Sequence, residues 1–211
     1  MKAIYPFVGS SENSCKFNLK NPQDLDSAFR LKFFGGWTHS TSGSLPNGTD
    51  GYAETYLNVD SALTPNSHAI TFYINSDPSG NPGDVRMTMG AYSASNGLTS
   101  YHQLTNKYFQ SGPNVSVSNT PGTKGFFGLS RNNNASEYYI VKSDGTYQTQ
   151  FLSTYTSINR TIYIGKVNGL LNPTDNQSIA FISISEGLTQ QEMTDLRTAV
   201  IEFQTTLGRN I

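Results

Sequence analysis

Residues 178–207 read SIAFISISEGLTQQEMTDLRTAVIEFQTTL, a short apolar run followed by a longer periodic one. From Ile179 to Ile184, apolar residues lie between serines, and a short apolar run with polar borders is typical of a β-strand. In the second run, apolar residues recur every three or four positions, which is the repeat of one helix face. The stretch therefore predicts a closing strand followed by a helix over about 189–207.

The predicted helix has signals at both ends. Thr189 precedes Glu192 by three residues, the spacing of a capping box, in which each side chain satisfies an unpaired backbone amide. Gly208 follows where a left-handed C-cap is expected, with Arg209 just beyond it. The apolar face consists of Met193, Leu196, Val200, Phe203 and Leu207. This face covers barely two heptads, so we expect it to dock on the outside of the domain, with an oligomer contact as the alternative.

The rest of the chain is a succession of short strands with frequent turn signals. The sequence favours strands at 4–8, 16–19, 29–34, 52–59, 69–74, 85–92, 98–104, 108–109, 115–117, 125–131, 138–142, 146–151 and 161–167. Residues 24–28 suggest one helical turn or a loop, 43–51 a loop, and Ser143-Asp144-Gly145 a tight hairpin. About a dozen strands and one long helix predict an all-β, two-sheet antiparallel sandwich. No linker divides it, so we expect a single domain over 1–211.

Two segments of the sequence resemble a known family. Residues 51–75, GYAETYLNVDSALTPNSHAITFYIN, and residues 180–210, AFISISEGLTQQEMTDLRTAVIEFQTTLGRN, are similar to concanavalin A-like lectin/glucanase (laminin-G-like) domains. The second segment looks like the version found in structural proteins of tailed bacteriophages and related prophage genes. The resemblance implies a jelly-roll sandwich with a C-terminal helix and a structural or adhesive role in a virion.

The composition narrows the classes of partner. The net charge is −1 and only 14% of residues are charged, which excludes binding to nucleic acid or to anionic lipid through an extended basic surface. Cys15 is the single cysteine, so no intrachain disulfide forms, and a buried free thiol is favoured over a reactive one. The N-terminus lacks the apolar core of a signal peptide, and no apolar run is long enough for membrane insertion. We expect a virion or extracellular location.

Catalytic patterns are missing from the sequence. Hydrolases of the resembled fold place two carboxylates on one strand, whereas Glu54 has no acidic partner at the required spacing. No nucleophile elbow occurs, and the three histidines are about thirty residues apart, unlike zinc ligands. We therefore expect no enzyme activity, no catalytic residue and no cofactor. A single Ca²⁺ bound by loop carbonyls and one of Asp77, Asp84 or Asp144 is compatible with the sequence.

Carbohydrate binding is the remaining chemistry. Sugars dock on aromatic faces surrounded by amide and hydroxyl groups. Trp37 with His39 beside it, and Tyr52, form one candidate set, and Arg131 with Asn132 at an expected polar hairpin tip forms another. The ordinary alternatives are a half-buried core tryptophan, tyrosines in cross-strand pairs, and a solvated hairpin.

The sequence thus favours a non-catalytic structural or adhesion domain of a phage-like virion, as a tail, fibre or head-decoration component. Its expected partners are other virion proteins and bacterial surface polysaccharide, and a homo-oligomer is compatible with the helix. One alternative is a carbohydrate-binding module of a larger bacterial surface protein or enzyme. Another is a glycan hydrolase whose acids converge from separate strands.

Overall fold

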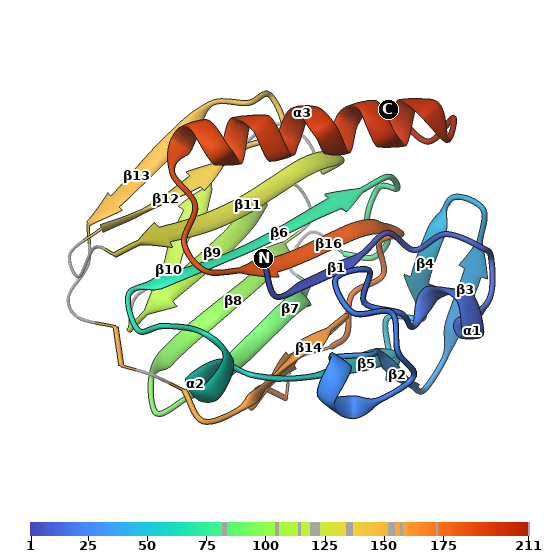
Figure 1. The fold of residues 1–211 in the computed structure, drawn as a ribbon, viewed down its shortest axis with the longest axis horizontal. Coiled ribbons are helices and arrows are strands. Elements are labelled where there is room, and N and C mark those ends of the chain that lie inside the picture. Colours follow the sequence, from blue (N-terminus) through green and yellow to red (C-terminus); the bar gives the residue numbers. More distant parts are fainter. Residues whose placement is uncertain are drawn as a thin grey trace.

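Two stacked β-sheets form the body of the protein (Figure 1). The computed structural model describes residues 1–81, 84–103, 106–113, 115–118, 123–133, 137–151, 155–156, 158–171 and 173–210. In chain order, sheet A contains β1 (Ala3–Tyr5), β3 (Trp37–Ser40), β4 (Gly43–Pro46), β6 (Ser67–Ile74), β11 (Gly125–Asn132), β12 (Glu137–Val141), β13 (Tyr147–Phe151) and β16 (Ile179–Ser185). Sheet B contains β2 (Lys32–Phe34), β5 (Tyr52–Asn58), β7 (Val85–Ser93), β8 (Asn96–Gln103), β9 (Asn106–Gly112), β10 (Val115–Ser118), β14 (Thr161–Ile164) and β15 (Val167–Asn168).

The strand order shows a sandwich in which distant segments pair. Sheet A runs β13-β12-β11-β6-β16-β4-β3, with β1 also on β16, and sheet B runs β10-β9-β8-β7-β14-β5-β2, with β15 on β7. Neighbouring strands are antiparallel except for β15 and β7. The predicted all-β sandwich with one C-terminal helix is therefore confirmed.

Helix α3 (Gln190–Thr206) lies across the outer face of sheet A (Figure 1). Thr189 and Glu192 form the predicted capping box, and Gly208 has the left-handed φ of +66° that ends the helix. Met193 and Val200 are buried against outward-facing residues of the sheet, including Phe126 of β11. The predicted docking of the helix on the sandwich is confirmed.

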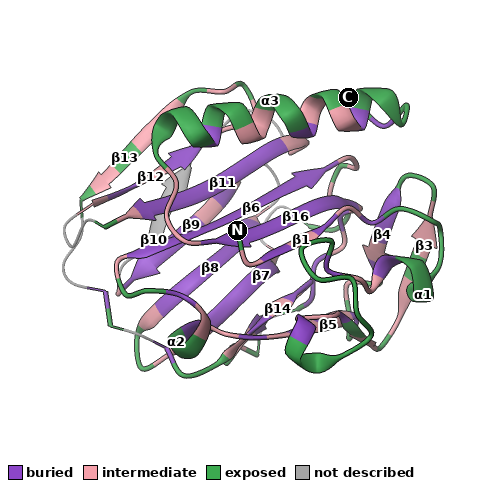
Figure 2. Ribbon diagram, viewed as in Figure 1, coloured by how far each residue is buried: buried purple, intermediate pink, exposed green. Residues whose placement is uncertain are grey.

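The main core lies between the two sheets (Figure 2). All eight residues of β6 are buried, because one face meets this core and the other lies under α3. In β5 the burial alternates, so Ala53, Thr55 and Leu57 point inward and their neighbours outward, as the sequence predicts. Alternation within a strand therefore decides which side chains face the surface.

Several predicted elements were wrong. Residues 16–19 form no strand, and the predicted strand 29–34 is only β2, because Phe29 has a left-handed φ of 58°. The loop expected at 43–51 contains β4, which pairs with both β3 and β16. Besides α3, the described part of the chain contains three short helices: α1 (Glu12–Cys15), the 3-10 helix η1 (Asp26–Ala28) and α2 (Val59–Ala62). Of the two alternatives at 24–28, a helical turn or a loop, the structure has the helical turn, as η1 over its last three residues.

Candidate functional site

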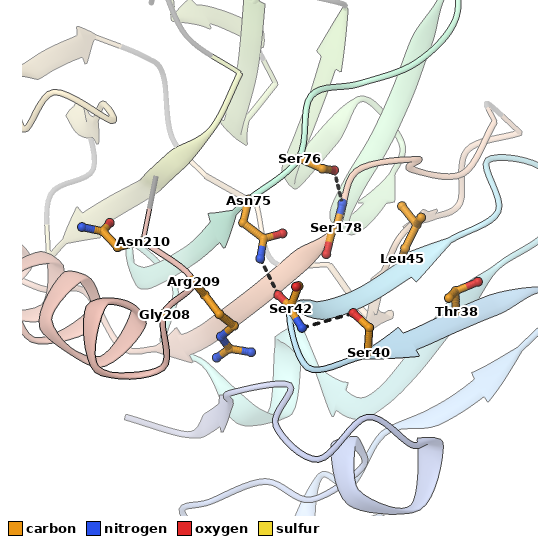
Figure 3. A pocket seen from close by; sticks show the side chains of 10 residues that line it. All are labelled: Thr38, Ser40, Ser42, Leu45, Asn75, Ser76, Ser178, Gly208, Arg209 and Asn210. Carbon is orange, nitrogen blue, oxygen red and sulfur yellow. Dashed lines mark hydrogen bonds between the residues drawn. The ribbon is translucent and has the colours of Figure 1, made fainter.

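A cavity of about 420 Å³ lies beside the β3–β4 hairpin, and we call it the β3–β4 groove (Figure 3). Strands β3 and β4 form one wall, the segments that follow β6 and precede β16 form the floor, and the residues after α3 form the other wall. Its lining residues are Thr38, Ser40, Ser42, Leu45, Asn75, Ser76, Ser178, Gly208, Arg209 and Asn210. Its volume is within the range of sites that hold small ligands.

Hydrogen bonds between distant segments hold the groove in shape. The side-chain amide of Asn75 donates to the carbonyl oxygen of Ser42, so the end of β6 is tied to the hairpin turn (Figure 3). The backbone N–H of Ser178 donates to Ser76 Oγ at 2.7 Å. On the opposite wall, the Tyr73 hydroxyl donates to Asn210 Oδ1 at 2.7 Å. Hydrogen bonds therefore join the segments that line the groove to one another and to the end of β6.

The lining of the groove suits a polyhydroxylated ligand. Hydroxyl and amide groups dominate it, and Leu45 supplies an apolar side chain. Arg209 is the one charged residue of the ten lining residues, and none of them is acidic. Hydroxyl and amide groups can both donate to and accept from sugar hydroxyls, while an apolar contact suits the C–H face of a sugar ring. The groove has the chemistry to bind a saccharide and carries no acid for its hydrolysis.

Trp37 and His39 lie on β3 but face away from the groove. Because side chains alternate along a strand, Thr38 and Ser40 point into the groove and Trp37 and His39 point inward. The Trp37 indole N–H donates to the carbonyl oxygens of Phe34 and Tyr52, both at 3.2 Å. Trp37 is half-buried and packs on the core, which is the ordinary alternative to a sugar platform.

His39, like Trp37, makes contacts within the fold. Its Nδ1 is hydrogen-bonded to Ser44 Oγ at 2.8 Å, and its ring meets that of Phe33 edge-on at 4.8 Å between centroids. Burial lowers the pKa of His39 and outweighs the opposite effect of Glu12. A neutral His39 therefore packs, together with Trp37, at the place where β3 of sheet A meets β2 of sheet B.

Tyr52 is the middle ring of a stack of three on the outer face of sheet B. Phe34 lies on one side at 4.9 Å and Tyr163 on the other at 5.0 Å between ring centroids. Since β5 lies between β2 and β14, the two neighbours cover opposite faces of the Tyr52 ring. The Lys166 Nζ also lies 5.5 Å from the Tyr52 centroid. The cross-strand pairing that was the alternative for Tyr52 is thus present.

Arg131 does not lie at an exposed hairpin tip, so that part of the sequence prediction was wrong. It is the seventh residue of β11, opposite His68 of β6, and its side chain is 0% exposed. Its Nη1 donates to the Ser111 carbonyl oxygen at 3.0 Å, and its guanidinium lies over the Tyr155 ring. The side chain faces the core because Arg131 lies an even number of residues from the core-facing residues of β11, and alternate residues of a strand share one face. With no exposed surface, Arg131 is not accessible to a glycan in this fold.

Asn132 lies at the other end of sheet A from the groove. It is half-buried and lines a second cavity, of about 260 Å³, with Glu137, Tyr139, Thr189 and Gln190. A glycan contact by Asn132 stays a prediction. Asn134, the last residue of the expected tip, lies outside the described residues.

A buried ionisable cluster occupies the core near β8 and β9. His102 Nε2 and Asp175 Oδ1 are 2.9 Å apart, and Lys107 contacts the Gln177 side-chain oxygen. Burial lowers the pKa of Lys107 to about 8. Burial would raise the pKa of Asp175, but His102 and Lys107 outweigh this effect and the pKa is lowered. Both members of the His–Asp pair are 1% exposed or less, so their role is to hold the segment before β16 against sheet B.

The aspartates considered for Ca²⁺ have other partners. Asp77 pairs with Thr123 and Lys124, and Asp84 lies 3.4 Å from Arg86. Asp144 accepts from the backbone and side chain of Thr146 within the β12–β13 hairpin. Within the described part of the chain, no three His, Cys, Asp or Glu side chains are placed to share a metal ion.

The sequence analysis singled out Trp37 and His39 beside the groove and missed the residues that line it. Asn75, Ser178 and Arg209 come from three segments that no local pattern joins. The available signal was the polar pair Thr38 and Ser40 that alternates with Trp37 and His39. That alternation gives two faces, but it does not tell which face is open.

Comparisons with known proteins identify the fold. No family model and no curated protein matches the chain. One similar structure is domain 4 of AbnA, a GH43 extracellular arabinanase from Geobacillus stearothermophilus, in complex with arabinotriose, at 14% identity and a TM-score of 0.60 over 93% of this chain and 97% of that one. Another is the receptor binding domain of botulinum neurotoxin D, at 12% identity and a TM-score of 0.62 over 94% of this chain and 52% of that one.

A third similar structure is the binding domain of botulinum neurotoxin DC in complex with SialylT, at 13% identity and a TM-score of 0.59. It is matched over 81% of this chain and 46% of its own, so the present chain spans about half of these toxin domains. At these identities the likeness shows a shared β-sandwich fold. None of the described helices is both long and apolar enough to cross a membrane.

Proposed function

We propose that this chain is a non-catalytic glycan-binding domain and that the β3–β4 groove is its binding site. The groove carries the proposal, because its lining offers hydroxyl, amide, guanidinium and apolar groups without an acid. The arabinotriose complex of one similar structure and the SialylT complex of another support a saccharide as the ligand class. The aromatic residues Trp37 and Tyr52 contribute to the fold beside this site.

For its biological setting, we propose a structural and adhesion domain of a phage-like virion that displays the sandwich to bacterial surface polysaccharide. The support for this setting is the resemblance of residues 180–210 to phage structural proteins. A carbohydrate-binding module of a larger bacterial enzyme is a second candidate. It is supported by the arabinanase domain, of which this chain covers 97%.

A glycan array with three variants tests the binding site. Thr38→Trp fills the groove from the exposed face of β3, and Thr198→Trp places the same ring on the exposed face of α3. Trp37→Phe changes the inward face of the same strand. We expect the wild type, Thr198→Trp and Trp37→Phe to bind the same glycans, and Thr38→Trp to bind at least about tenfold more weakly. Equal binding by Thr38→Trp would reject the groove, and a silent wild-type array would reject glycan binding.

A further inference from the structure

Arg209 forms part of the groove because of the way helix α3 ends. Gly208 takes a left-handed φ of +66°, and the Arg209 N–H then donates back to the Gln204 carbonyl oxygen at 2.8 Å. This reversal directs the Arg209 side chain under the helix end, where the residue is only 6% exposed (Figure 3). A cation is thereby fixed in the wall of the groove.

The charge of Arg209 is not neutralised within the described chain. Its Nη1 donates to the Phe7 carbonyl oxygen at 3.0 Å and its Nη2 to the Pro6 carbonyl oxygen at 3.2 Å. Carbonyl oxygens carry only partial charge, so the site keeps a net positive charge. Five other cations have a carboxylate within 4 Å: Lys2, Lys16, Arg30, Arg86 and Lys124. The buried Lys107 contacts the Gln177 side-chain oxygen instead, but it does not line the groove.

Arg209 also retains a donor. Among the described residues, its Nε is buried and has no hydrogen-bond partner. A buried donor without a partner and a buried charge without a counter-ion are both unfavourable, and burial lowers the pKa of Arg209. An anion in the groove beside the guanidinium would offset the uncompensated charge.

We propose that the β3–β4 groove selects acidic saccharides and that the carboxylate of a uronic or sialic acid residue is the counter-ion of Arg209. This inference rests on the proposed glycan-binding function and names its ligand class. The hydroxyls of Thr38 and Ser42 and the side-chain oxygen of Asn75 line the same groove and can bond the sugar hydroxyls around that carboxylate. A carboxylate held by a guanidinium forms charge-assisted hydrogen bonds, which are about twice as strong as neutral ones.

Two pairs of probes test the selection by calorimetric titration of the full chain. One pair is trigalacturonic acid and its methyl ester, and the other is 3′-sialyllactose and lactose. We expect at least one acid to bind about tenfold or more tightly than its neutral partner, with an advantage that shrinks as salt is added. The pair that shows the advantage tells whether the carboxylate comes from a uronic or a sialic acid.

Variants locate the effect without removing Arg209, which also holds residues 6–7. Thr38→Glu adds a negative charge to the groove, and Thr198→Glu adds the same charge on the exposed face of α3. We expect Thr38→Glu to abolish the preference for the acid and Thr198→Glu to keep it.

Three results would overturn the inference. Equal binding of the acids and their neutral partners would reject acid selection while glycan binding stands. A preference that survives Thr38→Glu would place the anion site elsewhere. If no array glycan and no probe binds, the proposed function fails together with the inference.

Discussion

His68 and Arg131 face each other across β6 and β11 and show how this core accommodates polar groups. His68 is 0% exposed, and its Nε2 is hydrogen-bonded to Ser111 Oγ at 2.7 Å. Burial, and secondarily the charge of Arg131, lowers the pKa of His68 to about 3. A neutral imidazole beside a guanidinium avoids placing two positive charges in one core.

This arrangement predicts a pH-dependent stability. Between pH 6.5 and pH 3 the unfolded chain binds a proton at His68 that the folded chain does not, so acidification favours unfolding. We expect His68 to reduce the free energy of unfolding by about 2 kcal/mol between pH 7 and pH 5. Urea unfolding at both pH values measures the loss. The variant His68→Gln should lose less stability over this interval, and an equal loss in both proteins would contradict the assignment.

At the scale of elements, α3 is held by only part of its apolar face. Met193 is 0% exposed and Val200 3%, whereas Leu207 is 41% exposed at the end of the helix. Phe203 lies under the Arg209 guanidinium, 5.7 Å from it, and is not among the residues packed on the sheet. The apolar anchoring of the helix is therefore concentrated before Phe203, while the buried Gln204 side chain holds the last turn by donating to the Ala180 carbonyl oxygen at 3.3 Å.

Alanine substitutions along this face should separate anchoring from exposed positions. Met193→Ala removes a fully buried side chain and should cost about 2–5 kcal/mol of unfolding free energy. Leu207→Ala removes a side chain already in solvent and should change that free energy by less than about 0.5 kcal/mol. Denaturant titration of both variants measures the difference. Similar costs would show that the helix docks by a different face.

Local patterns predicted the elements whose signals are local. The alternation in β5, the Asp144 hairpin and the Thr189 capping box depend on residues a few positions apart, and the structure contains all three. Strand β4 was missed because its Gly- and Pro-containing sequence is typical of a loop, and its pairing depends on β3 and β16. The predicted strand 125–131 includes Arg131, but its burial was missed because charged residues are usually exposed and its partners Ser111 and Tyr155 come from distant segments.

For the whole molecule, one core cluster includes residues from Ala3 of β1 to Ile184 of β16. The single domain stays a prediction, which this shared core supports. We expect one cooperative transition, with Trp37 fluorescence and far-ultraviolet circular dichroism changing at the same denaturant concentration. Two separate transitions would show that part of the chain folds independently.

The candidate site also depends on how the whole chain is folded. The groove needs the β3–β4 hairpin, the end of β6, the segment before β16 and the residues after α3 in one place. Such a site has no sequence motif, because its residues are brought together by strand order. The sequence shows polar residues directly after Trp37. It could not predict that Arg209 would lie across the groove from them.

The position of β16 also sets the order in which the protein can be completed during synthesis. β16 pairs with β6, β4 and β1, so the first strand of the chain waits for a partner made about 180 residues later. A nascent chain that has not yet emerged from the ribosome past residue 185 exposes the unpaired edges of β1 and β6. Such edges invite pairing with other chains. The yield of native protein should therefore depend on chaperone supply and translation speed. The stability of the finished sandwich alone should not predict this yield.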